Sequence, residues 1–210
     1  MSEGTVNAET PRGRRPAAVL AALLLLAAGA LVILTVFRSG NPGTNDPEAG
    51  FARDMSTHHA QAVRMSFIVR DRTDDRDVRL LAYDIINTQA AQIGMMTAWL
   101  DEWGVPKVDP AGRMRWMSGH GGHGGAGAMP GMATPEQLAE LEKASGRDAE
   151  VLYLRLMVAH HRGGVEMAKA VMALSDHDRV RRLAGTMVEG QQSEIDLMNA
   201  MLRERGAPTA

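Results

Sequence analysis

The chain of 210 residues contains no cysteine. This absence excludes disulfides, thiolate nucleophiles, iron–sulfur clusters and cysteine-type zinc sites, so any soft metal ligand must be methionine or histidine. Aromatic residues make up only 4% of the chain, whereas alanine, leucine, methionine and arginine are frequent, which favours helices over strands. The 23 basic residues are offset by 25 acidic ones, for a net charge of −2. No basic face suited to a phosphate backbone stands out, so nucleic acid is not expected as a partner.

A long apolar stretch at residues 17–37 has 21 positions without a charged side chain. About 20 helical residues cross the hydrocarbon core of a bilayer, so this stretch predicts a single transmembrane anchor. Three arginines precede it and one follows closely, and this positive-inside bias places residues 1–16 in the cytoplasm and the following domain outside. The sequence therefore predicts a membrane-anchored protein with an extracytoplasmic C-terminal domain.

A cleaved signal peptide is the alternative interpretation of the same stretch. Ala28-Gly29-Ala30 resembles a small-residue cleavage site, and cleavage there would release a secreted protein. The domain is exported under either interpretation. Residues 38–50 follow as a polar tether rich in glycine, proline and asparagine.

The rest of the chain is organised by an internal repeat at a constant offset of 102 residues. Residues 51–104 align with residues 153–206 without a gap, and 19 of the 54 aligned positions are identical. Each copy carries two apolar stripes with helical spacing of three and four, separated by a short polar break. Each copy is therefore predicted to be a helical hairpin. The helices are expected near residues 47–71, 75–103, 148–174 and 177–205.

The hairpins carry suitable capping residues. Thr73 or Asp74 could cap the second helix, and Gly104 and Gly206 stand where helix C-termini are commonly capped. Four amphipathic helices can bury their stripes only against each other. We therefore expect an all-α fold, a four-helix bundle with pseudo-twofold symmetry.

The two hairpins are joined by a linker at residues 105–133 and a short helix at residues 134–146. Thr134 begins this helix in a Thr-Pro-Glu-Gln sequence, which combines a cap residue, a proline in the first turn and a capping-box glutamine. Gly146 is expected to end it.

A Met-x-x-His-His motif occurs once in each copy. In the first copy Met55 precedes His58 and His59 by three and four residues, so the three side chains can converge within one helical turn and share an ion. Adjacent histidines on a helix diverge by about 100°, so one of each pair should face the hairpin seam. The candidate metal ligands of the two copies are Met55, His58, His59, Met157, His160 and His161.

The hairpin geometry places polar residues opposite this motif. With a bend near residue 73 or 74, His58 faces Gln89 and Met55 lies level with Gln92, and the second copy has the same arrangement. Unpaired polar groups in an apolar seam are costly, so these residues are expected to orient the imidazoles or to supply an occasional oxygen ligand. The residues concerned are Gln89, Gln92, Gln191 and Glu194. The sequence thus predicts two equivalent sites at matching heights.

Other methionines lie too far along the helices to join these sites. Met65 follows His58 by seven residues, about 10.5 Å at ~1.5 Å per residue, so it belongs to the core or to a second site. The same holds for its counterpart Met167. Met96 and Met198, on the second helix of each hairpin, are further candidates for such a second site.

Thioether and imidazole groups together suit copper, above all Cu(I), better than magnesium, calcium or manganese. Zinc is an alternative through histidine alone. Single methionines and histidines in a helix seam usually serve packing and hydrogen bonding, so the argument for metal rests on the repetition of the motif.

The linker is rich in the same residue types. It could be a flexible glycine-rich connection, or a loop that collects metal ions. Its candidate ligands are Met114, Met117, His120, His123, Met129 and Met132.

Two segments, FARDMSTHHAQAVRMS at 51–66 and LRLMVAHHRGGVEMA at 154–168, are each followed by a helix with Gln-x-x-(Gln/Glu)-Ile-x-x-Met. Together they closely resemble the domain of unknown function 305 family over residues 51–206. The resemblance implies a ferritin-like helical bundle in exported bacterial proteins, some of them linked to copper binding. Carried over by position, it points to Met55, His58, His59, Met65, Met157, His160, His161 and Met167.

The first copy departs from the family pattern at two places. It has Ala60-Gln61-Ala62 where the second copy has Arg162-Gly163-Gly164, and Gln92 where the family commonly has the glutamate seen at Glu194. These departures predict a weaker or altered first site.

Three functions compete at this point. The leading one is an extracytoplasmic protein that binds, buffers or confers tolerance to copper, with the metal ion as its partner and no catalytic residues. A metal-free scaffold or interaction module of the cell envelope is the second, with an unknown protein partner. The third is a ferritin-like di-iron oxidoreductase, but that chemistry uses Glu-x-x-His on two helices, and the sequence contains no Glu-x-x-His.

Overall fold

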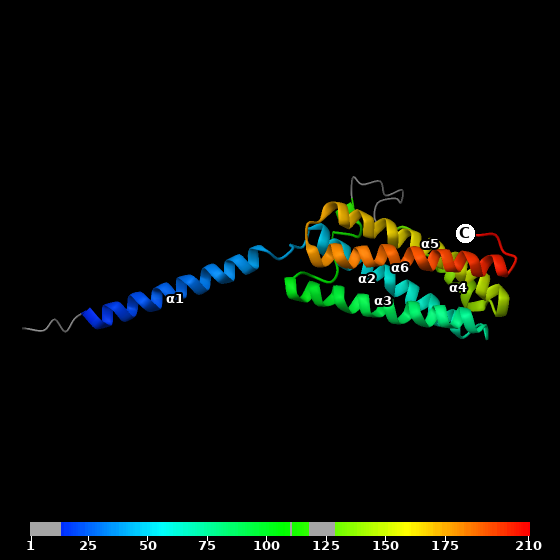
Figure 1. Ribbon diagram of the computed structural model, residues 1–210, viewed down its shortest axis with the longest axis horizontal. Helices are drawn as coiled ribbons and strands as arrows, with labels where there is room; N and C mark the ends of the chain where they lie inside the picture. The colour runs from blue at the N-terminus through cyan, green and yellow to red at the C-terminus, as the bar shows by residue number, and fades with distance from the viewer. Residues whose placement is uncertain (1–13, 110, 118–128) are drawn as a thin grey trace, which may run out of the picture. The chain divides into compact units, whose positions relative to one another are not determined.

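The computed structural model describes residues 14–109, 111–117 and 129–210 and divides into two units, Met1–Asn41 and Pro42–Ala210 (Figure 1). The first unit contains one helix, α1 (Arg14–Ser39), whose side chains are described over residues 19–31. Among the residues described, no helix is long and apolar enough to cross a membrane. This corrects the predicted anchor at residues 17–37 and the membrane-anchored placement built on it. The described side chains of α1, at residues 19–31, are fewer than the roughly 20 consecutive apolar residues that a crossing needs.

The second unit is helical, and no strand occurs in the parts of the chain that the structure covers. The expectation of an all-α fold is confirmed. Its helices are α2 (Pro47–Arg70), α3 (Arg76–Trp103), the 3₁₀ turn η1 (Arg115–Met117), α4 (Pro135–Lys143), α5 (Gly146–Leu174) and α6 (Asp178–Glu204).

Helix ends follow from local chemistry. Asp75, rather than the predicted Thr73 or Asp74, caps α3, and its carboxylate accepts hydrogen bonds from the backbone N–H groups of Asp77 and Val78. Gly104 caps the C-terminus of α3 with φ of 67°, in the left-handed region that glycine adopts without strain.

The short helix α4 begins as expected but ends early. Thr134 and Gln137 form both hydrogen bonds of a capping box. The helix stops at Lys143, and Gly146 does not end it but begins α5, with φ of 54°. The backbone N–H of Gly146 donates to the carbonyl of Arg72, so this residue fastens the start of α5 to the α2–α3 turn.

Helices α2 and α3 form one hairpin, α5 and α6 form the other, and the hairpins pack through α2 and α5 (Figure 1). Two contacts show that α2 and α5 are antiparallel: His160 bonds to the backbone of His58, and Tyr153 bonds to Ser66 at 2.9 Å. In antiparallel helices the residue numbers of contacting pairs have a nearly constant sum, and both pairs follow this rule. His58 and His160 are equivalent residues of the two copies, 102 positions apart, so their contact lies on the pseudo-twofold axis that relates the copies.

The buried apolar residues form two cores, separated along every long helix by polar positions. The first core includes Phe51, Met55, Met96, Leu100 and Met167. The second core includes Met65, Ile85, Tyr153, Met157 and Met198. The polar residues between them are called the central polar layer: His58, His59, Gln89, Gln92, His160, His161, Gln191 and Glu194.

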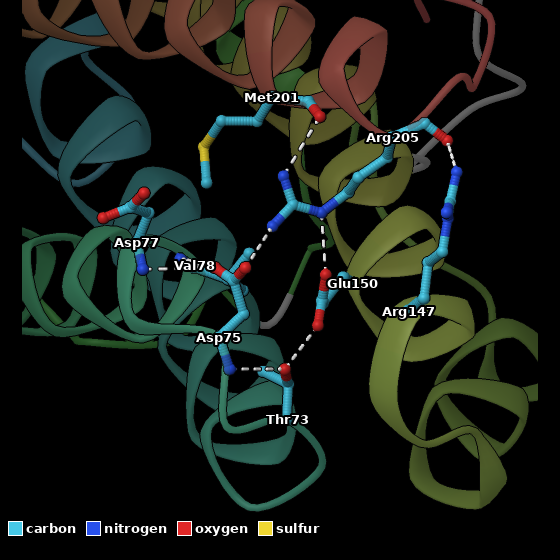
Figure 2. Close-up of polar contacts among 8 residues, drawn as sticks. All are labelled: Thr73, Asp75, Asp77, Val78, Arg147, Glu150, Met201 and Arg205. Carbon is cyan, nitrogen blue, oxygen red and sulfur yellow. Dashed lines mark hydrogen bonds and ion pairs between the residues drawn. The ribbon is translucent and has the colours of Figure 1, made fainter.

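An ion-pair network joins the two hairpins at one end of the molecule (Figure 2). Arg205, just after α6, donates to Glu150 of α5 at 2.7 Å and contacts Asp75, the N-cap residue of α3, at 2.9 Å. Glu150 also accepts from Thr73 in the α2–α3 turn. The Arg205 side chain is 11% exposed and that of Glu150 is 10% exposed, so this ion pair is largely shielded from water.

Candidate metal centre

The four histidines of the central polar layer are buried at the place where α2 meets α5. The imidazoles of His58 and His160 lie face to face on the pseudo-twofold axis, with ring centroids 3.7 Å apart and planes inclined by 31°. His59 and His161 flank them at centroid distances of 6.5 and 6.3 Å from their neighbours in sequence. The antiparallel packing of α2 and α5 thus brings the two Met-x-x-His-His motifs together.

Each of the four imidazoles uses Nε2 to reach an oxygen acceptor. His58 donates to the carbonyl of Pro130 at 3.0 Å, and His160 donates to the carbonyl of His58 at 3.0 Å. His59 Nε2 lies 2.7 Å from Gln92 Oε1, and His161 Nε2 lies 2.6 Å from Glu194 Oε2. Because carbonyl, amide and carboxylate oxygens accept, each of these Nε2 atoms is assigned a proton that it donates.

The opposite nitrogen of every ring is left without a partner. The Nδ1 atoms of His58, His59, His160 and His161 are buried and form no hydrogen bond with any described residue. The amide oxygens of Gln89 and Gln191 are unpartnered in the same layer. Buried polar atoms normally find a partner, so six such atoms in one layer make it a candidate site for an ion or another ligand.

Burial keeps the imidazoles of His58, His59 and His160 neutral. It lowers the pKa of His58 to about 4, against a smaller upward effect of the hydrogen bond to Pro130. Burial and the neighbouring His58 lower the pKa of His59 to about 3. Burial, followed by repulsion from the other three histidines, puts the pKa of His160 well below its usual value. At neutral pH these three rings therefore carry a free lone pair on Nδ1, which is the form that binds a metal ion.

The end of the linker contacts the central polar layer, and the sequence did not predict this contact. Gly131 has φ of 73°, and a Cβ there would lie 2.3 Å from the carbonyl oxygen of Ala159. A Cβ at Gly163 would lie 2.1 Å from the carbonyl oxygen of Pro130. Because these two residues are glycines, the backbone of the linker can pack directly against α5. This packing places the carbonyl of Pro130 within hydrogen-bond distance of His58. The small run at Gly163 and Gly164 was the only sequence signal for this contact.

The first copy makes a different contact at the corresponding position. Gln61, the counterpart of Gly163, donates its amide to the carbonyl of Ala133 at 2.9 Å and accepts from the backbone N–H of Ala133 at 2.7 Å. Gln61, at which the first copy departs from the family pattern, thus binds the end of the linker to α2.

Within each hairpin, the hydrogen-bonded partners differ from the predicted ones. His59 contacts Gln92 and His161 contacts Glu194, whereas His58 was expected opposite Gln89. Helical side chains tilt toward the N-terminus of their own helix. In an antiparallel hairpin the two side chains then lean toward opposite ends, so the residues that touch are a few positions away from those that lie level.

The predicted methionines are buried on both sides of the layer. Met55, Met96 and Met167 belong to the first core, and Met65, Met157 and Met198 belong to the second. Met55 and Met157 stand one helical turn from the histidines of their own motif. Each core therefore holds three of the predicted methionines, one of which belongs to a Met-x-x-His-His motif.

The candidate metal ligands of the linker differ in how deeply they are buried. Met117 is buried in the first core, Met129 is also buried, and Met114 and Met132 are half-buried. The backbone N–H of Met114 donates to Asp54 at 2.8 Å, which fixes the start of the linker to α2. His120 and His123 lie outside the described residues.

In this conformation, no three histidine, cysteine, aspartate or glutamate side chains of the described chain lie together as a metal-binding group. The donors present are therefore pairs of imidazoles with methionines on both sides, a set that fits a soft ion such as copper better than a hard one.

Comparison with known proteins places the chain among helical relatives. The family model for the domain of unknown function 305 (DUF305) matches residues 48–202. A predicted secreted DUF305 protein from Streptomyces coelicolor has 52% sequence identity and a TM-score of 0.74, with 80% of this chain and 99% of that chain covered. A DUF305 fragment from Deinococcus radiodurans has 32% identity and a TM-score of 0.65, covering 78% and 99% of the two chains.

A third similar structure is that of CopM in its Cu(II)-bound form. Its identity to this chain is 22% and its TM-score is 0.57, with 76% of this chain and 97% of CopM covered. At this identity the likeness shows a common fold. No curated protein matches the chain.

Proposed function

The chain belongs to the DUF305 family, and from that premise we propose that this member binds copper in its central polar layer. The observation that carries the proposal is the set of four buried Nδ1 atoms without hydrogen-bond partners among the described residues, each on a ring whose Nε2 is held by an oxygen. Metal-binding histidines commonly donate their other N–H to a carbonyl or carboxylate, which fixes the tautomer and the ring orientation.

The choice of copper rests on the donor set and on the relatives. Imidazole and thioether together, with no thiolate in the chain, favour copper over hard ions. CopM, which has the same fold, has been solved with Cu(II), Cu(I) and silver. Zinc is the alternative ion, since it could be held by the histidines alone.

We assign the ligands by their place in the layer. The imidazoles of His58 and His160 are the central nitrogen donors, and His59 and His161 are the flanking ones. Because the two central rings lie face to face, an ion between them requires at least one ring to turn about its side-chain torsions. The adjoining thioethers are Met55 and Met157, and a second site in each core would use Met65, Met96, Met167 and Met198.

The polar residues of the layer orient these donors. Gln92 and Glu194 hold His59 and His161, so their role is to fix the imidazole tautomer. Gln89 and Gln191, whose amide oxygens lack a partner in the described chain, are candidates for an additional oxygen ligand. The linker methionines Met114, Met117, Met129 and Met132, with His120 and His123, would collect metal ions for the layer.

Two further assignments belong to the same proposal. The Streptomyces coelicolor relative, at 52% identity, is a predicted secreted protein, and this supports copper binding outside the cytoplasm by a secreted form of this chain. Two antiparallel hairpins packed through one helix each, with donors on facing helices, also support a ferritin-like bundle as the fold.

The test is a titration of the full chain with Cu(I) under anaerobic conditions, in competition with a chromophoric Cu(I) chelator. Wild-type protein is expected to take copper from the chelator. The double variant His58→Ala/His160→Ala should lose at least about tenfold in affinity, which corresponds to ~1.4 kcal/mol. Repeating the titration with Zn(II) and Fe(II) identifies the preferred ion.

His177→Ala is the matched control. His177 also has a buried Nδ1 without a partner in the described residues, but it packs on Trp103 at the start of α6. Copper affinity should be unchanged in this variant. Equal affinity of the wild type and the double variant would refute the proposal, and a chain that retains no metal would favour an envelope scaffold.

A further inference from the structure

A hollow of about 270 Å³ lies between the start of α3 and the end of α6, away from the central polar layer. Its apolar part is formed by Leu80, Leu81, Leu197, Ala200 and Met201. The charged residues that line it are all acidic: Asp77, Asp84 and Glu204.

The apolar side chains of the hollow are partly exposed to water, and its acidic side chains lack ion-pair partners in the described part of the chain. Leu80 is 55% exposed and Leu197 is 50% exposed, so two large apolar side chains lie half in water beside a hollow. None of the three carboxylates forms an ion pair with another residue in the described part of the chain. An apolar floor with an unpaired acidic rim is typical of an interaction surface.

The internal duplication supplies a second version of the same place for comparison. Under the 102-residue offset, Asp77 corresponds to Arg179 and Glu204 corresponds to Glu102. Arg179 and Glu102 form a two-point ion pair across α6 and α3, with distances of 2.6 and 2.9 Å. The duplicated position is thus bridged by a cation of the chain itself.

At the hollow that cation is replaced by an anion. Asp77 and Glu204 carry the same charge at the positions where Arg179 and Glu102 attract each other, so no bridge can form there. Leu80 also stands where the other copy has Arg182. The two substitutions remove positive charge and add apolar surface at one end of the α3–α6 seam only.

We infer that the hollow between α3 and α6 is a docking site for an amphipathic segment of another protein, one that presents arginine next to apolar side chains. The arginine would pair with Asp77 and Glu204 as Arg179 pairs with Glu102, and the apolar side chains would cover Leu80 and Leu197. Two copies of this chain meeting through this face would oppose carboxylate to carboxylate, which disfavours self-association. The inference does not depend on copper binding.

The probe is a fluorescent, leucine-rich amphipathic helical peptide of about 15 residues with arginines beside its apolar face. Binding to the full chain is followed by fluorescence anisotropy. We expect the variant Asp77→Arg, which recreates the ion pair of the other copy, to bind the peptide at least about tenfold more weakly than the wild type. Asp84→Arg should weaken binding in the same direction, and circular dichroism verifies the helical fold of both variants.

Glu166→Arg is the matched control, because it makes the same change of charge at an exposed position of α5. It should leave peptide binding unchanged, and a peptide with glutamate in place of arginine should not bind. Equal binding to the wild type and Asp77→Arg, or an equal loss in Glu166→Arg, would overturn the inference. Self-association of the wild type in sedimentation that Asp77→Arg abolishes would also overturn it, since the occupant would then be a second copy.

Discussion

The chemistry of the central histidines is decided by which ring nitrogen has a partner. All four rings use Nε2 for a hydrogen bond, and their buried Nδ1 atoms have no partner among the described residues. A histidine that only stabilises the core would be expected to satisfy both nitrogens or to reach water with one of them. Buried Nδ1 atoms without a partner carry a cost in folding stability, which a bound metal ion would offset.

The same burial predicts how the metal-free protein responds to acid. His58 and His59 have folded pKa values of about 4 and about 3, below the ordinary value of 6.5. Between those values and 6.5 the unfolded chain binds more protons than the folded one, so stability is highest above pH 6.5 and falls as the pH decreases. Each histidine should cost about 2 kcal/mol between pH 7.5 and 5.

Urea unfolding of the metal-free chain at pH 7.5 and pH 5 measures this loss. The variant His58→Gln/His59→Gln should show a smaller difference between the two pH values than the wild type. A wild-type free energy of unfolding that is the same at pH 5 and pH 7.5 would show that these rings are not kept neutral by burial.

At the scale of the elements, two glycines of similar helical setting should respond in opposite ways to substitution by alanine. At Gly163 of α5 a Cβ would lie 2.1 Å from the carbonyl oxygen of Pro130, so the linker end must move and the acceptor of His58 moves with it. Gly163→Ala is expected to destabilise the chain by about 2 kcal/mol.

Gly185 of α6 is the control, since a Cβ there meets nothing within 4 Å. Gly185→Ala should stabilise the helix by about 0.5–1 kcal/mol, because alanine loses less backbone entropy than glycine. Thermal unfolding followed by circular dichroism compares the two variants. If both substitutions stabilise the chain, the close contact between the linker and α5 does not exist in solution.

At the scale of the whole molecule, Arg205 holds the two hairpins together from one end (Figure 2). Its partners Glu150 and Asp75 belong to different hairpins, and its ion pair with Glu150 is largely shielded. Removing one member leaves the other charge without its partner in a poorly solvated place. Arg205→Met is therefore expected to reduce the free energy of unfolding by about 2–3 kcal/mol.

Arg179→Met tests an ion pair of similar geometry in water. The side chains of Arg179 and Glu102 are 42% and 48% exposed, so their pair should contribute less than about 1 kcal/mol. Chemical denaturation of both variants gives the comparison. Equal losses in the two variants would mean that burial does not distinguish the Arg205 network.

The duplication, the long helices and the Met-x-x-His-His motifs could be recognised in the sequence because they depend on local periodicity. Helix periodicity survives in any packing arrangement, so the four long helices of the second unit, α2, α3, α5 and α6, lie within about two residues of their expected bounds. The N-cap of α3 was placed one or two residues too early, because several polar residues in that turn can serve as caps.

The sequence by itself determined the helical class, the two hairpins and the residue types available for a soft metal. Only the tertiary structure decided that α2 and α5 cross as antiparallel neighbours, which puts His58 against His160 on the pseudo-twofold axis. It also decided which nitrogen of each imidazole is free, because that depends on acceptors from distant segments such as Pro130 and Glu194. Such contacts leave no local periodicity in the sequence, since they join residues that are far apart along the chain.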